Sequence, residues 1–250
     1  MPKREMVHDL KSDDRRVAVP LYTVAEAARA LGVPAATFGT WARGYERHPP
    51  GRPSYRGEPI VTAFPNRGYL YPSVPFVGLV EGMVLAAIRR SGVPLQRIRP
   101  ALDALAREIG VTHALASQRL YTDGAEVLFD FAQHGARDER ESAALQDLVV
   151  IRSGQRVFTD IVSEYLTRIS YDSKDKFATM IRLPEYERAE VLVDPDRSFG
   201  QPIFGTGGVR VVDVMDRFWA GEDLDEVADD FGVPRSDIED VVRVASRRAA

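Results

Sequence analysis

The sequence predicts a mainly α-helical fold with small β-hairpins: a winged helix-turn-helix followed by a C-terminal three-helix module of the helix-turn-helix type. Two observations support this prediction. Apolar residues recur at helical spacing along much of the chain. In addition, one turn pattern occurs twice, as Ala28 followed by Gly-Val-Pro at 32–34 and as Ala228 followed by Gly-Val-Pro at 232–234. This pattern joins the two helices of a helix-turn-helix.

The composition excludes several classes of protein. The chain has 250 residues and 44% apolar content, which is enough to build ordinary hydrophobic cores. It has no cysteine, and its four histidines have no recognisable ligand spacing, so we expect no metal and no cofactor. The segment 1–16 is too charged for a secretory signal, and the longest apolar run, 74–88, is interrupted by a proline, two glycines and a glutamate. We therefore expect a cytoplasmic protein without a membrane segment.

Charge is distributed unevenly along the chain. Residues 1–100 hold 15 Lys/Arg against 8 Asp/Glu, a net charge of +7. Residues 101–190 have a net charge of −5 and residues 191–250 a net charge of −6. Because contacts to phosphates dominate nucleic-acid affinity, this asymmetry predicts that only the first part of the chain binds DNA.

The first helix-turn-helix has clear start and stop signals. Thr23 is the expected N-cap of a helix over 22–31, and Glu26 completes a capping box. Gly32 ends that helix, and a second helix over 35–43 carries Phe38 and Trp41 on one face. The segment 45–58 is rich in Pro, Gly and Arg and is expected to be a loop. Strands at 60–64 and 69–71, joined by a turn at 65–68, are expected to form the wing.

The segments after the wing are predicted from periodicity and turn residues. Helices are expected over 77–90 and 95–109, followed by a hairpin over 118–131 around 122–124 and by a charged loop or helix start at 137–141. A further helix is expected over 158–169, then a turn at 174–176 and extended stretches at 178–183 and 189–193.

The C-terminal module repeats the helix-turn-helix pattern with the opposite charge. Its three helices are expected to present apolar faces that contain Val211, Val214, Met215, Phe218 and Trp219; Leu224, Val227, Ala228 and Phe231; and Ile238, Val241, Val242 and Ala245. The stretch 224–248 holds seven acidic residues against four arginines, a balance that repels phosphates. DNA is therefore assigned to the first copy and a protein surface to the second. The alternative that either copy is a helical hairpin used only for packing stays open.

Two stretches resemble known families. The order helix, turn, helix and wing, followed by the segment 85–99 with Gly92-Val93-Pro94-Leu95, resembles the N-terminal domain of MerR-type regulators. The stretch 194–206, with Asp194-Pro195, Gly200-Gln201-Pro202 and Gly205-Thr206, resembles a family of short prokaryotic antitoxins, although Gly207-Gly208 stands where that family has an arginine. Together they resemble the longer VapB-type antitoxins. This resemblance implies a nuclease toxin of the PIN class as the partner.

Candidate binding residues follow from these assignments. In the second helix and the loop after it, polar and aromatic residues are candidates for contacts with DNA bases or phosphates: Thr37, Thr40, Trp41, Arg43, Tyr45, Arg52, Arg56 and Arg67. Trp41 fits the core better than a ligand role, and the exposed residues could also form an ordinary solvated face. Candidates for contacts with the protein partner are Phe199, Pro202, Phe204, Asp229, Asp230, Arg247 and Arg248.

The sequence offers no support for catalysis. The adjacent carboxylates Asp229/Asp230 and Glu239/Asp240 point apart on a helix, so they cannot converge as an acid and a base. The stretch 205–208 lacks the lysine of a nucleotide-binding loop. The chain is expected to be a regulator without enzymatic activity.

The expected organisation has four parts: an N-terminal tail (1–20), a MerR-like winged helix-turn-helix (21–110), a connecting or dimerising region (111–190) and a partner-binding helical module (191–250). As an antitoxin, a homodimer would bind operator DNA, repress its own operon and inhibit a PIN-type ribonuclease. The alternative is a ligand-sensing MerR-like regulator without a toxin, which a large apolar pocket within 111–190 would favour. A non-DNA adaptor is a further alternative.

Overall fold

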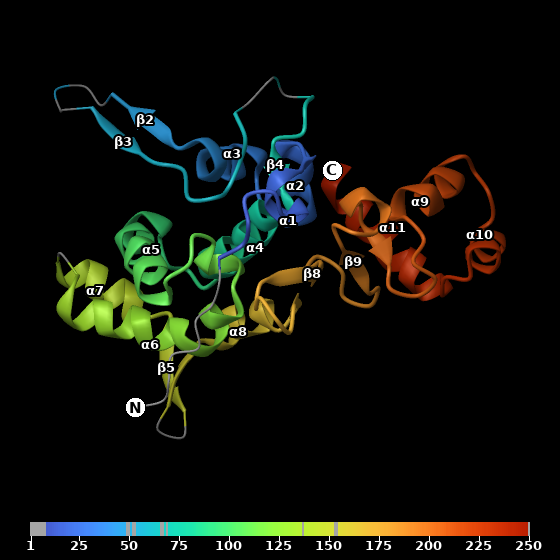
Figure 1. The fold of residues 1–250 in the computed structure, drawn as a ribbon. Helices are drawn as coiled ribbons and strands as arrows, with labels where there is room; N and C mark the ends of the chain where they lie inside the picture. Colours follow the sequence, from blue (N-terminus) through green and yellow to red (C-terminus); the bar gives the residue numbers. More distant parts are fainter. Residues whose placement is uncertain are drawn as a thin grey trace.

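The computed structural model describes residues 9–48, 51, 54–65, 68, 70–136, 138–152 and 155–249. It is mainly helical, with small antiparallel sheets, as predicted (Figure 1). None of the helices in this described part is long and apolar enough to cross a membrane.

The first helix-turn-helix forms as the sequence predicts. A short helix α1 (Arg15–Ala18) and strand β1 (Pro20–Tyr22) lead into α2 (Val24–Ala30), which starts at a capping box between Thr23 and Glu26. Gly32 has a φ of +62°, a left-handed conformation that favours glycine, and it directs the chain into α3 (Ala35–Arg43).

The sequence predicted a loop over 45–58 and a wing hairpin over 60–71, and both predictions are wrong. The segment expected to be a loop contains an antiparallel hairpin of β2 (Tyr45–Arg47) and β3 (Tyr55–Gly57). The strands expected at 60–64 and 69–71 do not form in the described residues, where Phe64 N–H donates to Ser73 O across an irregular loop. The reason is that residues 60–62 are held by other elements: the N–H groups of Ile60 and Val61 both donate to Trp41 O.

Helix α4 (Phe76–Arg90) lies at the centre of the molecule, after the two-residue strand β4 (Val74–Pro75), which pairs with β1. Every residue from 76 to 88 is buried. Two glycines allow close packing on this helix. A Cβ at Gly82 would lie 2.5 Å from Phe38 of α3, and one at Gly78 would lie 2.1 Å from the carbonyl oxygen of Thr62. Helix α5 (Leu95–Ile109) follows after a short turn.

The middle region is more helical than expected. The hairpin predicted over 118–131 is wrong, because this segment belongs to the single helix α6 (Gln118–His134). Around it lie η1 (Ala114–Ala116), α7 (Glu139–Gln146), the hairpin of β5 (Val149–Arg152) and β6 (Gln155–Phe158), and α8 (Asp160–Leu166). The helix predicted over 158–169 corresponds to α8, which is shorter than expected.

A four-stranded antiparallel sheet connects this region to the C-terminal module. Its strand order is β10-β9-β8-β7, formed by β7 (Ile169–Tyr171), β8 (Ala178–Arg182), β9 (Val191–Val193) and β10 (Ile203–Phe204). The predicted turn at 174–176 and the two extended stretches are confirmed. The one-turn helix η2 (Ser198–Gly200) lies between β9 and β10.

The chain ends in the three helices that the sequence predicts: α9 (Val211–Trp219), α10 (Leu224–Phe231) and α11 (Arg235–Ala249). Trp219 is the exception to the predicted apolar faces, because it is 60% exposed. The last turn of α11 carries Arg248, which lies 3.8 Å from Glu185. Buried residues from α2 to α11 form one continuous hydrophobic cluster.

Candidate nucleic-acid interface

A cleft of about 490 Å³ lies between the second helix of the first helix-turn-helix and the turn that joins α4 to α5. Thr37, Thr40, Trp41 and Tyr45 line one side of it, and Arg89 and Arg99 line the other. Arg89 Nη1 donates to the Thr37 hydroxyl at 3.3 Å, so the two sides are connected. Four of the predicted DNA-binding residues thus meet two arginines that the sequence reasoning missed.

Arg99 also fixes the β2–β3 hairpin. Its guanidinium carbon lies 5.7 Å from the centre of the Tyr45 ring, and its Nη1 donates to the carbonyl oxygen of Glu58. On the hairpin, the Tyr45 ring packs over Gly57, where a Cβ would lie 2.3 Å from the ring. The hairpin is therefore attached to the start of α5 through a charged group that borders the cleft.

The remaining predicted DNA-binding residues have different environments. Arg43 is exposed, and its guanidinium lies against Gly39. Trp41 lines the cleft but is only 4% exposed and packs against Phe38, as expected of a residue that belongs mainly to the core. Arg56 is exposed and forms an ion pair with Glu58 at 3.2 Å. Arg52 and Arg67 lie outside the described residues.

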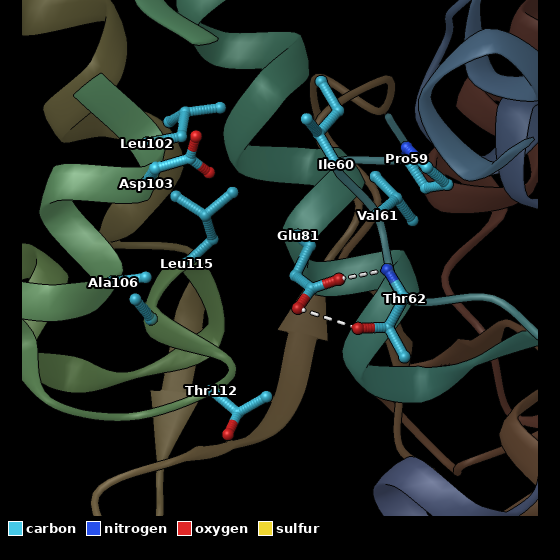
Figure 2. Close-up of a pocket in the computed structure, with 11 residues that line it drawn as sticks. Pro59, Ile60, Val61, Thr62, Glu81, Leu102, Asp103, Ala106, Thr112 and Leu115 are labelled. Carbon is cyan, nitrogen blue, oxygen red and sulfur yellow. Dashed lines mark hydrogen bonds between the residues drawn. The ribbon is translucent and has the colours of Figure 1, made fainter. Parts of the chain in front are cut away.

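A second cavity, of about 260 Å³, lies under the segment 59–62 (Figure 2). Glu81 of α4 points toward Thr62 in this view, and its carboxylate accepts hydrogen bonds from the Thr62 N–H at 2.6 Å and hydroxyl at 3.1 Å. His113 Nδ1 lies 3.1 Å from the same carboxylate. Burial alone would lower the pKa of His113, but the hydrogen bond and charge of Glu81 outweigh it and raise that pKa.

This buried cluster clamps the end of the hairpin segment to α4. The cavity beside it is small and is lined by Asp103 and Thr112 as well as by apolar groups. Most of its lining comes from outside residues 111–190, the region in which a ligand-sensing regulator was expected to hold a large apolar pocket. Within the described residues, no group of three or more acidic or histidine side chains could hold a metal ion.

The second helix-turn-helix has the same turn but a different outer surface. Gly232 is left-handed, as Gly32 is, and ends α10. The positions that correspond to Thr37, Thr40 and Arg43 are Asp237, Asp240 and Arg243. Asp240 is fully buried, and its carboxylate accepts hydrogen bonds from the N–H groups of Arg188 at 2.8 Å and Ala189 at 3.1 Å. The position that corresponds to Thr40 of α3 is therefore used internally in α11, whereas Arg243 stays exposed.

Replacing Asp240 by alanine should lower the free energy of unfolding by about 2–4 kcal/mol at neutral pH, because the part-buried N–H of Arg188 and the buried N–H of Ala189 lose a charged acceptor. Burial alone would raise the pKa of the Asp240 carboxyl, but the hydrogen bonds from Arg188 and Ala189 outweigh it and lower that pKa. The stabilisation is thus present above the unfolded-state pKa of about 3.9 and is lost as pH falls through the folded-state pKa. Urea titrations of the parent and the variant should therefore converge in acid.

Asp240→Asn is the matched control for this prediction, since it keeps one acceptor oxygen and removes the charge. It should lose less stability than Asp240→Ala and show a weaker dependence on pH. A constant difference between parent and Asp240→Ala from neutral to acidic pH would contradict the assigned role of the carboxylate.

The predicted partner-binding residues do not form one surface. Phe199 is 79% exposed and has a φ of +54°, a strained conformation for a residue with a side chain. Phe204 is fully buried in β10, so its assignment as a partner contact is wrong: it belongs to the core. Pro202 is partly buried. Asp229 and Asp230 are exposed, and Asp230 forms an ion pair with Arg217 at 2.8 Å.

The two terminal arginines also differ. Arg247 is exposed, whereas Arg248 lies 3.8 Å from the carboxylate of Glu185. Glu185 in turn accepts a hydrogen bond from Arg90 at 2.7 Å and packs against Gly32, where a Cβ would lie 2.0 Å from its carboxylate. Glu185 therefore links the end of α11 to the turn of the first helix-turn-helix, and Arg248 is engaged within the molecule.

One exposed feature of the C-terminal module escaped the sequence reasoning. Val212, Asp216 and Trp219 are exposed on α9 at helical spacing, and the Trp219 ring contacts Phe218 edge-on with centroids 5.0 Å apart. Amphipathic spacing placed Trp219 in the core, but α9 buries only Val214 and Met215 fully. The exposure of Trp219 depends on which elements pack against α9, and the sequence alone does not reveal them.

Comparisons with known proteins match both helix-turn-helix regions. The model of a family described as "Putative DNA-binding HTH domain" matches residues 20–102, and that of a family described as "Protein of unknown function (DUF433)" matches residues 191–244. The crystal structure of Rv2018 from Mycobacterium tuberculosis is similar with a TM-score of 0.79 and 47% identity, and the match covers 91% of this chain and 99% of that chain.

Two curated relatives, both from Mycobacterium tuberculosis, align over nearly the whole chain. The protein named "Putative antitoxin VapB45" is 50% identical over 227 residues, which cover 91% of this chain and 94% of the relative. The protein named "Uncharacterized protein Rv2308" is 30% identical over 227 residues, covering 89% of this chain and 88% of the relative. The chain therefore belongs to the same VapB-type antitoxin family as VapB45, with a helix-turn-helix domain of the DNA-binding kind at residues 20–102.

Proposed function

We propose that this protein is an antitoxin that binds operator DNA through the cleft beside α3 and inhibits a PIN-type ribonuclease through its C-terminal module. The observation that carries the DNA-binding half is the convergence of Thr37, Thr40, Arg89 and Arg99 on one cleft next to the helix that follows the first turn. Hydroxyl and guanidinium groups are the side chains that most often contact phosphates and base edges. The segment 1–100, which contains the cleft, has a net charge of +7.

In this proposal the β2–β3 hairpin acts as the wing. Its strand β3 carries the exposed Arg56, and the interaction of Arg99 with Tyr45 and Glu58 holds the hairpin at the edge of the cleft. A phosphate that contacts Arg99 would therefore also meet the hairpin. A homodimer would place two such surfaces on a symmetric operator and repress the operon of the pair.

The partner half of the proposal rests on the C-terminal module. Phe199 and Trp219 are exposed aromatic side chains, of the kind that anchor protein interfaces, and carboxylates such as Asp216 and Asp229 are exposed in the same module. The acidic balance of residues 191–250 complements the basic, RNA-binding face that a ribonuclease needs. The family relationship to VapB45 and the resemblance of 194–206 to short antitoxins support the class of partner.

Arg43→Ala in the full chain should weaken operator binding by about 1–3 kcal/mol if Arg43 reads a guanine, and should relax the preference at one base position. Fluorescence anisotropy with the promoter duplex and with single-base variants measures both quantities. Arg140 is exposed on α7 and outside the cleft, so Arg140→Ala is the matched control and should bind as the parent does. An unchanged affinity and footprint in Arg43→Ala would remove Arg43 from the interface.

The partner half is tested by co-expression of the full chain with the nuclease encoded by the adjacent open reading frame. We expect the two proteins to co-purify and the nuclease activity on RNA to fall in the complex. The toxin assignment would be refuted if the neighbouring gene product lacked nuclease activity or did not bind this chain. The operator-binding titration tests DNA binding independently of this result.

A further inference from the structure

Two arginines face each other at the start of the four-stranded sheet. The N–H of Arg182 donates to the carbonyl oxygen of Arg168 at 2.9 Å, which continues the pairing of Ile169 with Ile181. Residues that are directly opposite in an antiparallel pair project their side chains from the same face, with Cβ atoms about 5 Å apart. Like charges in this position repel each other, so a negative charge beside them would stabilise the arrangement.

The side chains near these arginines compensate their positive charge only in part. Arg168 is 18% exposed and donates from Nη2 to Glu164 at 2.7 Å, but its Nε and Nη1 are buried without a hydrogen-bond partner in the described residues. The Nε of Arg182 and the hydroxyl of Tyr165 are also buried and unpartnered within that part of the chain. Tyr165 is only 4% exposed. Buried donors without acceptors are rare because each one is costly.

Two more arginines border this cluster. The Arg90 guanidinium lies over the Tyr165 ring, with its carbon 5.6 Å from the ring centre, and Arg248 shares the carboxylate of Glu185 with Arg90. Among the described residues, Arg168 pairs with Glu164, and Arg90 and Arg248 share Glu185, so three arginines share two carboxylates. Positive charge is therefore in excess here, in a chain whose overall charge is −4.

We propose that Tyr165, Arg168 and Arg182, with Arg90 over the Tyr165 ring, form a binding site for a phosphate group. We call these four residues the arginine seam. A tetrahedral phosphate presents acceptor oxygens in several directions and can accept from the unpartnered Nε, Nη1 and hydroxyl donors together. Its negative charge also offsets the repulsion between Arg168 and Arg182. The planar guanidinium fork suits this anion better than an ammonium group does.

The position of the seam suggests two sources for the phosphate. Glu185, which pairs with Arg90, packs against Gly32 of the first helix-turn-helix, so a phosphate of the DNA backbone can approach the same region. A free phosphate or phosphomonoester is the other source. The chemistry is shared, and the experiment separates the two.

The test compares the melting temperature of the full chain in phosphate and in chloride, at neutral pH and equal ionic strength. At a phosphate concentration 100-fold above Kd, the Tm should rise by about 5–10 °C. Arg182→Met should abolish this rise. In chloride alone, the same variant should melt at or above the parent temperature, because removal of one arginine relieves the repulsion. A purely structural role for Arg182 predicts the opposite, a lower Tm in both salts.

Two further arms complete the test. Arg140→Met, which removes an exposed arginine of α7, should keep the phosphate response of the parent. If the phosphate belongs to DNA, Arg182→Met should also reduce the slope of log DNA affinity against log salt concentration by about 1. If the site takes free phosphate, the variant should keep the parent slope, and the parent protein should broaden the phosphorus NMR line of inorganic phosphate. A Tm rise that persists in Arg182→Met, or no phosphate-specific rise together with an unchanged salt slope, would overturn the proposal.

Discussion

Full-length protein in which Arg43, Arg89 and Arg99 are all replaced by alanine should bind operator DNA about 100-fold or more weakly than the parent at physiological salt. Arg89 and Arg99 line the cleft beside α3, and loss of two phosphate contacts lowers the salt slope by about 0.9 for each. Loss of Arg43 adds the cost of a base contact. Because Arg99 also holds Tyr45 and Glu58, its removal loosens the β2–β3 hairpin at the same time.

Titrations at several salt concentrations distinguish this effect from a general loss of charge. The matched control replaces Arg140, Arg188 and Arg247, which are exposed and lie outside residues 20–102, and so removes the same net charge from other surfaces. We expect the control to keep nearly the parent slope. If the variant at Arg43, Arg89 and Arg99 and the control behave alike, DNA contacts neither the exposed face of α3 nor this cleft.

The second large effect concerns the partner. Phe199→Ala together with Trp219→Ala should weaken binding of the nuclease by about 1,000-fold, since an anchoring aromatic residue typically contributes about 2 kcal/mol or more and each 1.4 kcal/mol is a factor of ten. Both side chains are largely exposed in the free chain, at 79% and 60%, so truncation should leave the free energy of unfolding almost unchanged. Surface plasmon resonance with the co-expressed nuclease measures the affinity.

The control for this variant truncates exposed apolar residues of another region. Tyr121 of α6 and Ile161 of α8 are 48% and 43% exposed, so Tyr121→Ala with Ile161→Ala removes comparable apolar surface outside the C-terminal module. The control should bind the nuclease as the parent does. Equal losses in the two double variants would place the interface in the middle region or at no single site.

The elements that the sequence predicted well are those with local signals. The capping box of Thr23 and Glu26 and the left-handed Gly32 are interactions between near neighbours, so the bounds of α2 and α3 follow from the residues themselves. The same holds for the second turn at Gly232. The burial of Phe38 and of one apolar face on each C-terminal helix follows from helical spacing.

The failures have long-range causes. The segment 122–124 has the residues of a tight turn, yet it lies inside α6, where Gly124 allows close packing because a Cβ there would approach the Phe158 ring to 3.2 Å. Leu120 and Leu128, at helical spacing on either side, are both buried. In the candidate site, Arg89 and Arg99 could not be linked to α3 from sequence alone, since only the packing of α4 against α3 brings them to Thr37 and Tyr45.

The two helix-turn-helix units show which residues of this motif are free to change. Gly32 and Gly232 satisfy the same backbone requirement, whereas the outward positions hold Thr40 in one unit and the buried Asp240 in the other. The turn therefore fixes the path of the chain and does not by itself specify a ligand. The same turn leads into a helix that lines a cleft in one unit and into a helix whose carboxylate holds the backbone of another segment in the other.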